Sequence, residues 1–259
     1  MSEARGSAAT REIDYQGYLL LDRLLELQAP RSWPEHPDEM HFIITHQAIE
    51  LWFRLMVRTV RQARDEVAAA EWVAATATAR RLTRYTGVVL AQTSTLAEMP
   101  PGAFHKFRQF LGTASGLQSS QFRELEILSG HRDESYLDAL RRAGGGRLEG
   151  RHTKALAEPS LAAALQQGAA DAGVRDWARF YAEEAGRSPL YTLCEALVDY
   201  DEAWFRWRCE HRILVERMLG GGTGTAGTRP SYLEKSLQIR FFPWLWQARG
   251  ALALLSPDA

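Results

Sequence analysis

Two histidines and an arginine occupy helical positions where polar side chains are uncommon. His211 lies in an aromatic segment and shares one predicted helical face with Trp204, Arg208 and Val215. A histidine on such a face is either a hydrogen-bonded core residue or an axial ligand of haem iron, for which imidazole is a usual choice. The pattern is compatible with both interpretations.

A second histidine, His46, lies on the apolar face of a different predicted helix, with Phe42 and Glu50 at helical spacing. Two inward-facing histidines are compatible with haem held by both. They are equally compatible with one ligand and one base that contacts the substrate. Periodicity does not distinguish these arrangements.

Arg108 shares a predicted helical face with Phe104, Phe107 and Leu111. Burying a guanidinium among apolar side chains is costly unless an anion meets it. The anion is either an internal Asp or Glu or the carboxylate of a substrate, which arginine can bind with two parallel hydrogen bonds. An amino-acid substrate would supply that carboxylate.

A glycine-rich stretch over 220–227 contains Gly-x-Gly-x-x-Gly, but it follows a long predicted helix instead of a strand. Without a strand–helix–strand unit it does not indicate a dinucleotide site. It is either a mobile lid over a ligand or a plain connector. The sequence also lacks His-Glu-x-x-His, a P-loop, Gly-x-Ser-x-Gly and a helical Glu-x-x-His pair, so haem is the best-motivated cofactor.

Helices must position these residues, because no alternating apolar runs indicate strands. We expect an all-α chain with one helical-bundle domain over 1–259, in which residues 1–14 are disordered and 15–30 form an N-terminal arm. Proline, glycine and periodicity predict long helices over 39–70, 74–98 and 188–219, a short helix around Arg108 and a closing helix over 231–255. The stretch 130–185 has no clear pattern.

Composition restricts the class of partner. The chain has 259 residues, 46% of them hydrophobic, and a formal net charge of -1, so we expect a sizeable core and no nucleic-acid or membrane partner. Its two cysteines, Cys194 and Cys209, lie in one predicted helix about 22 Å apart and cannot pair. With a charged N-terminus and no apolar run of about 18 residues, we expect a cytoplasmic protein that binds a small molecule.

Four segments in this order together resemble tryptophan 2,3-dioxygenase, a family of haem-dependent homotetramers. They are Tyr-Gln-Gly-Tyr-Leu at 15–19, Asp-Glu-Met-His-Phe-Ile-Ile-Thr-His-Gln-Ala-Ile-Glu-Leu-Trp-Phe at 38–53, Phe-Arg-Gln-Phe-Leu with Ala-Ser-Gly-Leu-Gln-Ser over 107–119, and His-x6-Met-Leu-Gly leading into Gly-Thr over 211–225. The resemblance extends from residue 15 to about residue 250 and is weakest over 130–185.

The resemblance implies that His211 binds the iron of haem b and that Ser115 lies near the haem. It implies that His46, on the opposite side, accepts a hydrogen bond from the indole N–H, and that Phe42 packs on the indole ring. Arg108 would bind the substrate carboxylate. In this role His46 orients the substrate and is not an essential base.

The resemblance also implies that Thr225 binds the ammonium and carboxylate end of the substrate. Tyr15, Tyr18 and Leu19 match the arm that, in the family, reaches the active site of a neighbouring subunit, which implies a homo-oligomer, a tetramer in this family. The reaction implied is oxygenation of the indole C2=C3 bond with O₂ as co-substrate, and the family product is N-formylkynurenine.

Three departures from the family pattern bear on the substrate. Phe104, expected at the substrate, stands where the family usually has tyrosine, His41 replaces a leucine, and residues 224–228 read Gly-Thr-Ala-Gly-Thr. The missing hydroxyl removes a hydrogen bond worth about 1–2 kcal/mol. The departures favour a substituted tryptophan such as β-methyltryptophan, and an alternative reaction that adds one oxygen atom to give an oxindole-type product in secondary metabolism. A non-catalytic haem sensor is a third interpretation, although it would not need Arg108 and His46.

Overall fold

The computed structural model describes residues 14–112, 114, 116–220, 222 and 232–255. Over these residues every regular element is a helix and no strand is present, which confirms the all-α prediction. None of the helices in this part of the chain is long and apolar enough to cross a membrane.

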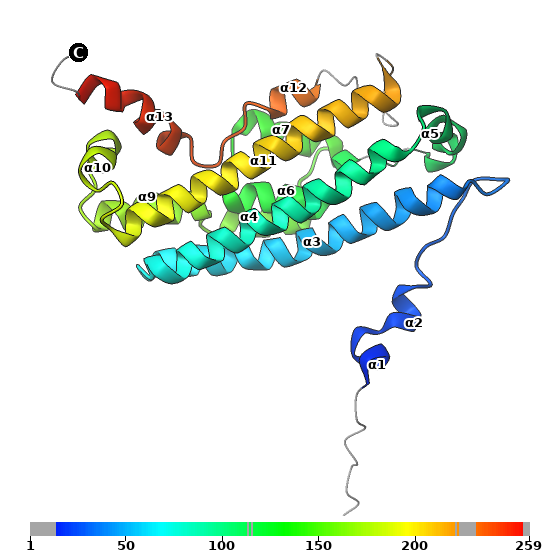
Figure 1. Ribbon diagram of the computed structural model, residues 1–259, viewed down its shortest axis with the longest axis horizontal. Coiled ribbons are helices and arrows are strands. Elements are labelled where there is room, and N and C mark those ends of the chain that lie inside the picture. Colours follow the sequence, from blue (N-terminus) through cyan, green and yellow to red (C-terminus); the bar gives the residue numbers. More distant parts are fainter. Residues whose placement is uncertain (1–13, 113, 115, 221, 223–231, 256–259) are drawn as a thin grey trace, which may run out of the picture.

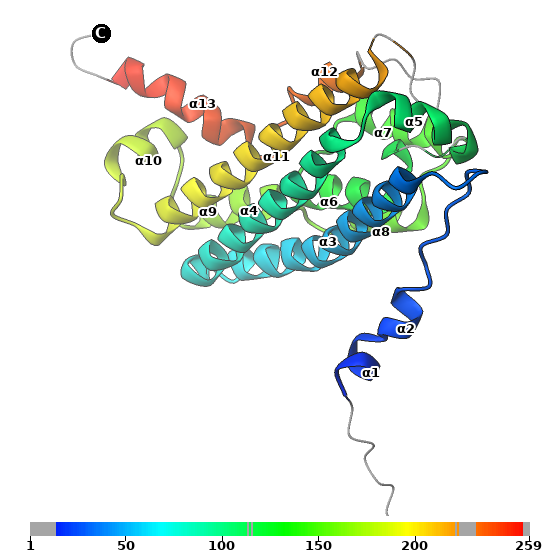
Figure 2. The ribbon, with the colours of Figure 1, turned by 45° about the vertical axis from the view of Figure 1, so that its right-hand side comes forward.

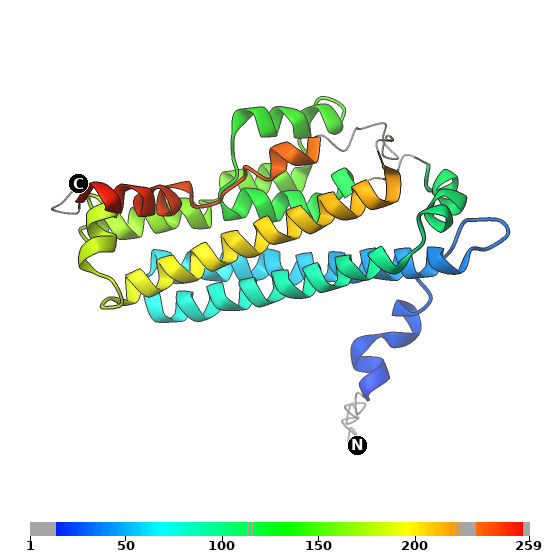
Figure 3. The ribbon, with the colours of Figure 1, turned by 45° about the horizontal axis from the view of Figure 1, so that its top comes forward.

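Three long helices form the frame of the molecule (Figure 1): α3 (Pro37–Ala68), α4 (Trp72–Thr95) and α11 (Pro189–Leu219). Helix α3 runs in the opposite direction to α4 and α11, which are parallel to each other and lie side by side in Figures 1 and 3. Their bounds agree with the predicted helices to within a few residues. Both histidines singled out from the sequence therefore lie on this frame.

Local sequence explains where these helices begin and end. Pro37 and Pro189 occupy first-turn positions, where the missing N–H of proline costs nothing. The hydroxyl oxygen of Ser188 caps α11 by accepting a hydrogen bond from the backbone N–H of Tyr191, at 3.1 Å. The helix ends at Gly220, whose φ of 57° is favourable for glycine alone.

The stretch 130–185, which showed no clear pattern in sequence, folds into four short helices: α7 (Glu134–Ala143), α8 (Gly150–Ala157), α9 (Leu161–Asp171) and α10 (Trp177–Glu183). Helix α6 (Ser120–Ser129) comes directly before them. Helices α6 and α9 pack against α3, and α8 packs against α6. They form a second layer, drawn in green behind the long helices in Figure 3. This layer closes the bundle on one side.

The prediction of one closing helix over 231–255 was wrong. The structure has α12 (Tyr232–Ser236), a break, α13 (Pro243–Ala251) and a final 3₁₀ turn, η4 (Leu252–Leu255). The buried carboxylate of Asp201 accepts hydrogen bonds from the backbone N–H groups of Phe241, at 2.8 Å, and Phe242, at 3.1 Å. Because these N–H groups bond to α11, they cannot continue a helix.

The N-terminal arm extends away from the bundle (Figures 1 and 2) and contains two short helices, α1 (Tyr15–Leu19) and α2 (Leu21–Leu24). Two side-chain amides join its base to α3, because Gln28 donates a hydrogen bond to Gln47 at 2.6 Å. Tyr15 is 73% exposed and Tyr18 is 76% exposed. Leu20 and Leu25 on the same arm are also exposed, and several large apolar side chains exposed together usually mark an interaction surface.

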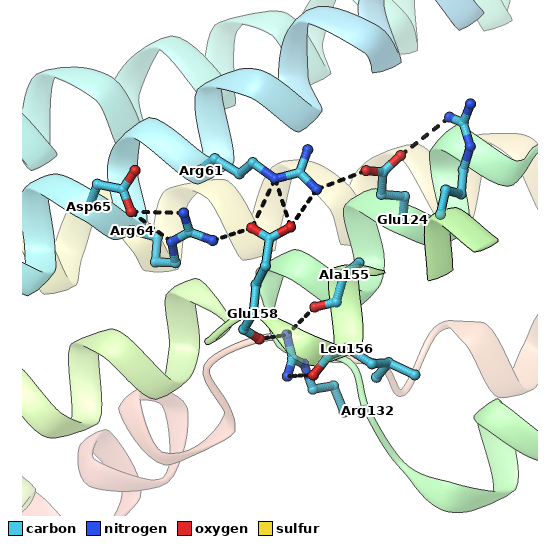
Figure 4. Close-up of polar contacts among 9 residues, drawn as sticks. Arg61, Arg64, Asp65, Glu124, Arg132, Ala155, Leu156 and Glu158 are labelled. Atoms are coloured by element: carbon cyan, nitrogen blue, oxygen red, sulfur yellow. Dashed lines mark hydrogen bonds and ion pairs between the residues drawn. The ribbon is translucent and has the colours of Figure 1, made fainter. Parts of the chain in front are cut away.

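A polar network joins α3 to the second layer (Figure 4). The carboxylate of Glu158 accepts hydrogen bonds from Arg61, at 2.8 and 3.0 Å, and from Arg64. Arg61 also pairs with Glu124 of α6 at 3.0 Å, and Arg132 donates to backbone carbonyls that include that of Glu158. The hydrogen bonds from Arg61, followed by those from Arg64, lower the pKa of Glu158 to about 2 against the cost of burial.

Replacing Glu158 by glutamine should therefore destabilise the protein in a pH-dependent way. The pKa of Glu158 in the folded protein lies below its ordinary value of 4.5. The stabilisation by the ionised carboxylate is therefore complete above pH 4.5 and is lost as the pH falls through about 2. We expect E158Q to lower the free energy of unfolding by about 2 kcal/mol at neutral pH and progressively less in acid, measured by urea unfolding with far-UV circular dichroism. E183Q, which removes the carboxylate of an exposed pair with Arg179, is the matched control. A loss in E158Q that does not change with pH would contradict this account.

Candidate active site

The buried apolar side chains form two separate clusters. The larger one fills the space between the long helices and the second layer. The smaller one lies beneath the short helix α5 (Pro101–Arg108) and comprises Leu96, Met99, Ala103, Phe107, Leu214 and Met218. We use the word seam for the level of the bundle that lies between these two clusters.

His46 lies at the seam, because Phe42 packs against the smaller cluster and Ile49 belongs to the larger one. The His46 ring lies 4.1 Å from that of Phe42, and its Nδ1 is 2.7 Å from the Phe42 carbonyl oxygen. A carbonyl can only accept, so Nδ1 carries the hydrogen and Nε2 of the neutral ring is an acceptor. His46 is exposed, so the prediction that it faces inward was wrong. The surrounding protein nevertheless lowers the pKa of His46 by desolvation.

His211 lies at the same level on α11, between Trp207, which packs against the larger cluster, and Leu214 of the smaller one. Burial, followed by smaller electrostatic contributions from His46 and Arg123, lowers the pKa of His211 to about 4. The imidazole is thus neutral at neutral pH, as a metal ligand must be.

The smaller cluster brings other predicted residues to the seam. The Phe42 ring lies 5.9 Å from that of Phe104 and 5.7 Å from that of Phe107. Arg108 is the last residue of α5 and is half-buried. Phe42, His46, Phe104 and Arg108 therefore occupy one end of the bundle together with His211.

The remaining predicted site residues are not brought together here. Tyr15, Tyr18 and Leu19 lie on α1, which extends away from the bundle (Figure 2). Ser115 and Thr225 lie outside the described residues. Their proposed roles stay predictions.

Arg123 influences the site electrostatically, although sequence reasoning did not identify it. Its guanidinium lies 4.8 Å from the centroid of the Phe122 ring and pairs with Glu126 at 2.6 Å. Its charge also lowers the pKa of His211. A single arginine in a charged helical segment has no distinctive sequence signal, since its influence on His211 depends on how α6 packs against α11.

A buried ion pair fixes that packing. Glu126 and Arg208 lie 3.3 Å apart, and only 2% of each side chain is exposed. The Tyr136 hydroxyl donates a hydrogen bond to Glu126 at 2.9 Å. Burial alone would raise the pKa of Glu126, but the charges of Arg123 and Arg208 outweigh it and lower the pKa. The carboxylate therefore stays ionised.

The helical bundle has two apolar clusters, and His46 and His211 lie at the level between them. Proteins of this class can hold a flat group, bound through a histidine, between their helices. The family model of tryptophan 2,3-dioxygenase matches residues 2–175 and 176–252. The tryptophan 2,3-dioxygenase of Nocardioides sp. is 37% identical over 93% of this chain and 95% of the relative, and that of an Anaeromyxobacter species is 36% identical over 95% and 98%. The chain belongs to the tryptophan 2,3-dioxygenase family, whose members are haem-dependent oxygenases.

The residues of the seam fit a haem. His211 offers a neutral imidazole, and the rings of Phe42, Phe122 and Trp207 offer apolar surfaces on either side of this level. Nothing in this set of side chains opposes the cofactor of the family.

Replacing Glu126 by glutamine should destabilise the protein strongly, because it removes the charge that compensates a fully buried Arg208. We expect a loss of about 3–5 kcal/mol in the free energy of unfolding, measured by urea unfolding. E134Q, at an exposed pair with Arg141, should change it by less than about 1 kcal/mol. Equal effects of E126Q and E134Q would show that the buried pair is not important for stability.

Proposed function

We propose that this chain binds haem b through His211 and uses O₂ to oxygenate the indole C2=C3 bond of L-tryptophan or a close derivative. The observation that carries the proposal is the seam, because His46 of α3 and His211 of α11 both lie at the level between the two apolar clusters. Family membership supports dioxygenation to N-formylkynurenine as the reaction. The proposal includes a cytoplasmic location, for which the two free cysteines are a supporting observation.

The cofactor, when bound, supplies the activation of O₂. The chain then has to bind and orient the substrate beside it. In the proposal, the Nε2 atom of His46 accepts a hydrogen bond from the indole N–H, because Nδ1 is already committed to the Phe42 carbonyl. This bond fixes the rotation of the indole in the site. The lowered pKa of His46 keeps Nε2 unprotonated for this purpose.

Arg108 holds the other end of the substrate in this proposal. A half-buried guanidinium at the end of α5 can form two parallel hydrogen bonds with the carboxylate of an amino acid. Thr225 is proposed to contact the ammonium and carboxylate groups, and Ser115 to lie near the haem. Phe42, together with Phe104, shields the indole from water.

The alternative reaction is addition of one oxygen atom to a substituted tryptophan, such as β-methyltryptophan, to give an oxindole-type product in secondary metabolism. The observation that favours it is Phe104, whose ring packs against Phe42 at 5.9 Å and Phe107 at 5.5 Å. An apolar wall at this position offers no hydroxyl to the carboxylate end and accommodates an additional methyl group without a desolvation cost.

We also propose that the chain works as a homo-oligomer, a tetramer as expected for the family. Tyr15, Tyr18 and Leu19 would then pack at the active site of a neighbouring copy. The exposure of both tyrosines on the arm supports this arrangement, since an aromatic surface in water gains free energy when a partner covers it.

Haem reconstitution and product analysis under ¹⁸O₂ test the function. We expect stoichiometric haem binding with a Soret band, and loss of that binding in H211A. A panel of L-tryptophan and β-substituted tryptophans then identifies the substrate. Mass spectrometry should show two labelled atoms in a dioxygenation product and one in an oxindole-type product. A wild-type chain without a Soret band, or one that binds haem but converts none of these compounds, would contradict the proposal.

Replacing Arg108 by alanine should mainly raise KM for an amino-acid substrate, by about ten- to a hundredfold for the loss of a charge-assisted hydrogen bond. The reason is that the carboxylate loses its partner while the seam is unchanged. 3-Methylindole, which has no carboxylate, provides the control, because R108A and the wild type should bind it equally, as measured by the shift of the Soret band. Equal weakening of both compounds would place Arg108 in a structural role.

A further inference from the structure

Thr93 and Trp207 form a hydrogen-bonded pair between α4 and α11 beside the seam. The indole Nε1–H of Trp207 donates to the Thr93 hydroxyl oxygen at 3.0 Å. Thr93 is buried, and its own hydroxyl donates to the carbonyl oxygen of Val89 at 2.8 Å. Since the proton of the hydroxyl is committed to α4, its oxygen can only accept from Trp207. The direction of both hydrogen bonds is therefore fixed.

Aromatic neighbours confine the Trp207 ring further. The Phe122 ring lies 5.2 Å away, and the Trp204 ring lies 5.3 Å away in an edge-to-face arrangement at 83°. A hydrogen bond at one edge and rings from α6 and α11 leave the indole little freedom to rotate. The plane of Trp207 is thus set by three helices.

The His211 ring lies parallel to this fixed plane. Trp207 and His211 are one turn apart on α11, their ring centroids are 5.2 Å apart, and the angle between their planes is 1°. A metal-binding histidine usually gains its orientation from a hydrogen bond at its second nitrogen. Within the described part of the chain His211 makes no such bond, so stacking on Trp207 is the contact available to orient it.

We propose that Thr93 and Trp207 are positioning residues for the imidazole of His211, holding its plane in the orientation that presents one nitrogen to the cofactor. The inference rests on the proposed function, in which His211 binds the haem iron. Thr93 acts only through Trp207, because its hydroxyl contacts the indole and not the imidazole. Loss of the hydroxyl should therefore have the same effect as loss of the indole N–H.

The test compares T93V, T93S and W207F in the haem-reconstituted protein. T93V removes the acceptor and keeps the side-chain shape, whereas W207F removes the indole donor and keeps an aromatic ring. We expect each to weaken haem affinity about tenfold and to shift and broaden the iron–histidine stretching band in resonance Raman spectra of the ferrous protein. T93S, which keeps the hydroxyl, should restore both. The T93V/W207F double variant should show no further loss, because both changes break one hydrogen bond.

T86V is the matched control. Thr86 is equally buried on α4 and its hydroxyl also donates to a backbone carbonyl, that of Leu82, at 3.0 Å, but it makes no contact with Trp207. It should leave the stretching band unchanged. If T93V fails to fold, W207F carries the test alone.

The outcomes separate this inference from the proposed function. A wild-type protein whose iron–histidine band is absent, or persists in H211A, would overturn both. A band that depends on His211 but is identical in the wild type, T93V and W207F would overturn the positioning role alone. Additive losses in the double variant would also overturn it, because the two residues would then act separately.

Discussion

The pairing of Glu126 with Arg208 is the interaction on which the site depends. Two fully buried charges from α6 and α11 are stable only in a narrow geometry, because neither can return to water without breaking the fold. Arg208 lies one turn before His211, and Glu126 also holds Arg123. The second layer is thereby fixed to the long helix that carries the candidate ligand.

Elements whose signals are local could be predicted from sequence, and those that depend on distant partners could not. The three long helices follow from a 3.6-residue period, together with Pro37 at the start of α3 and Ser188 and Pro189 at the start of α11. The closing helix was predicted wrongly because Asp201, far away in sequence, takes the N–H groups of Phe241 and Phe242. The short helices over 130–185 have too few turns for periodicity to define them.

The same distinction applies to the site. His46, His211 and Phe42 stood out because a polar or aromatic side chain at helical spacing is visible in sequence. The hydrogen bond between Thr93 and Trp207 could not be seen in the sequence, because it joins two helices whose register is defined only in the folded bundle. The tautomer of His46 likewise required the position of a backbone carbonyl.

The division of the apolar side chains into two clusters has a consequence for how such a protein can diversify. Phe42 and Phe104 pack against the smaller cluster, whereas most of the buried apolar surface belongs to the larger one. Free-energy changes at sites that share no contacts are nearly additive and independent. The end of the bundle around the smaller cluster can therefore accept new side chains, while the larger cluster keeps the fold stable. In this architecture selection for a new substrate and selection for a stable fold act on different residues.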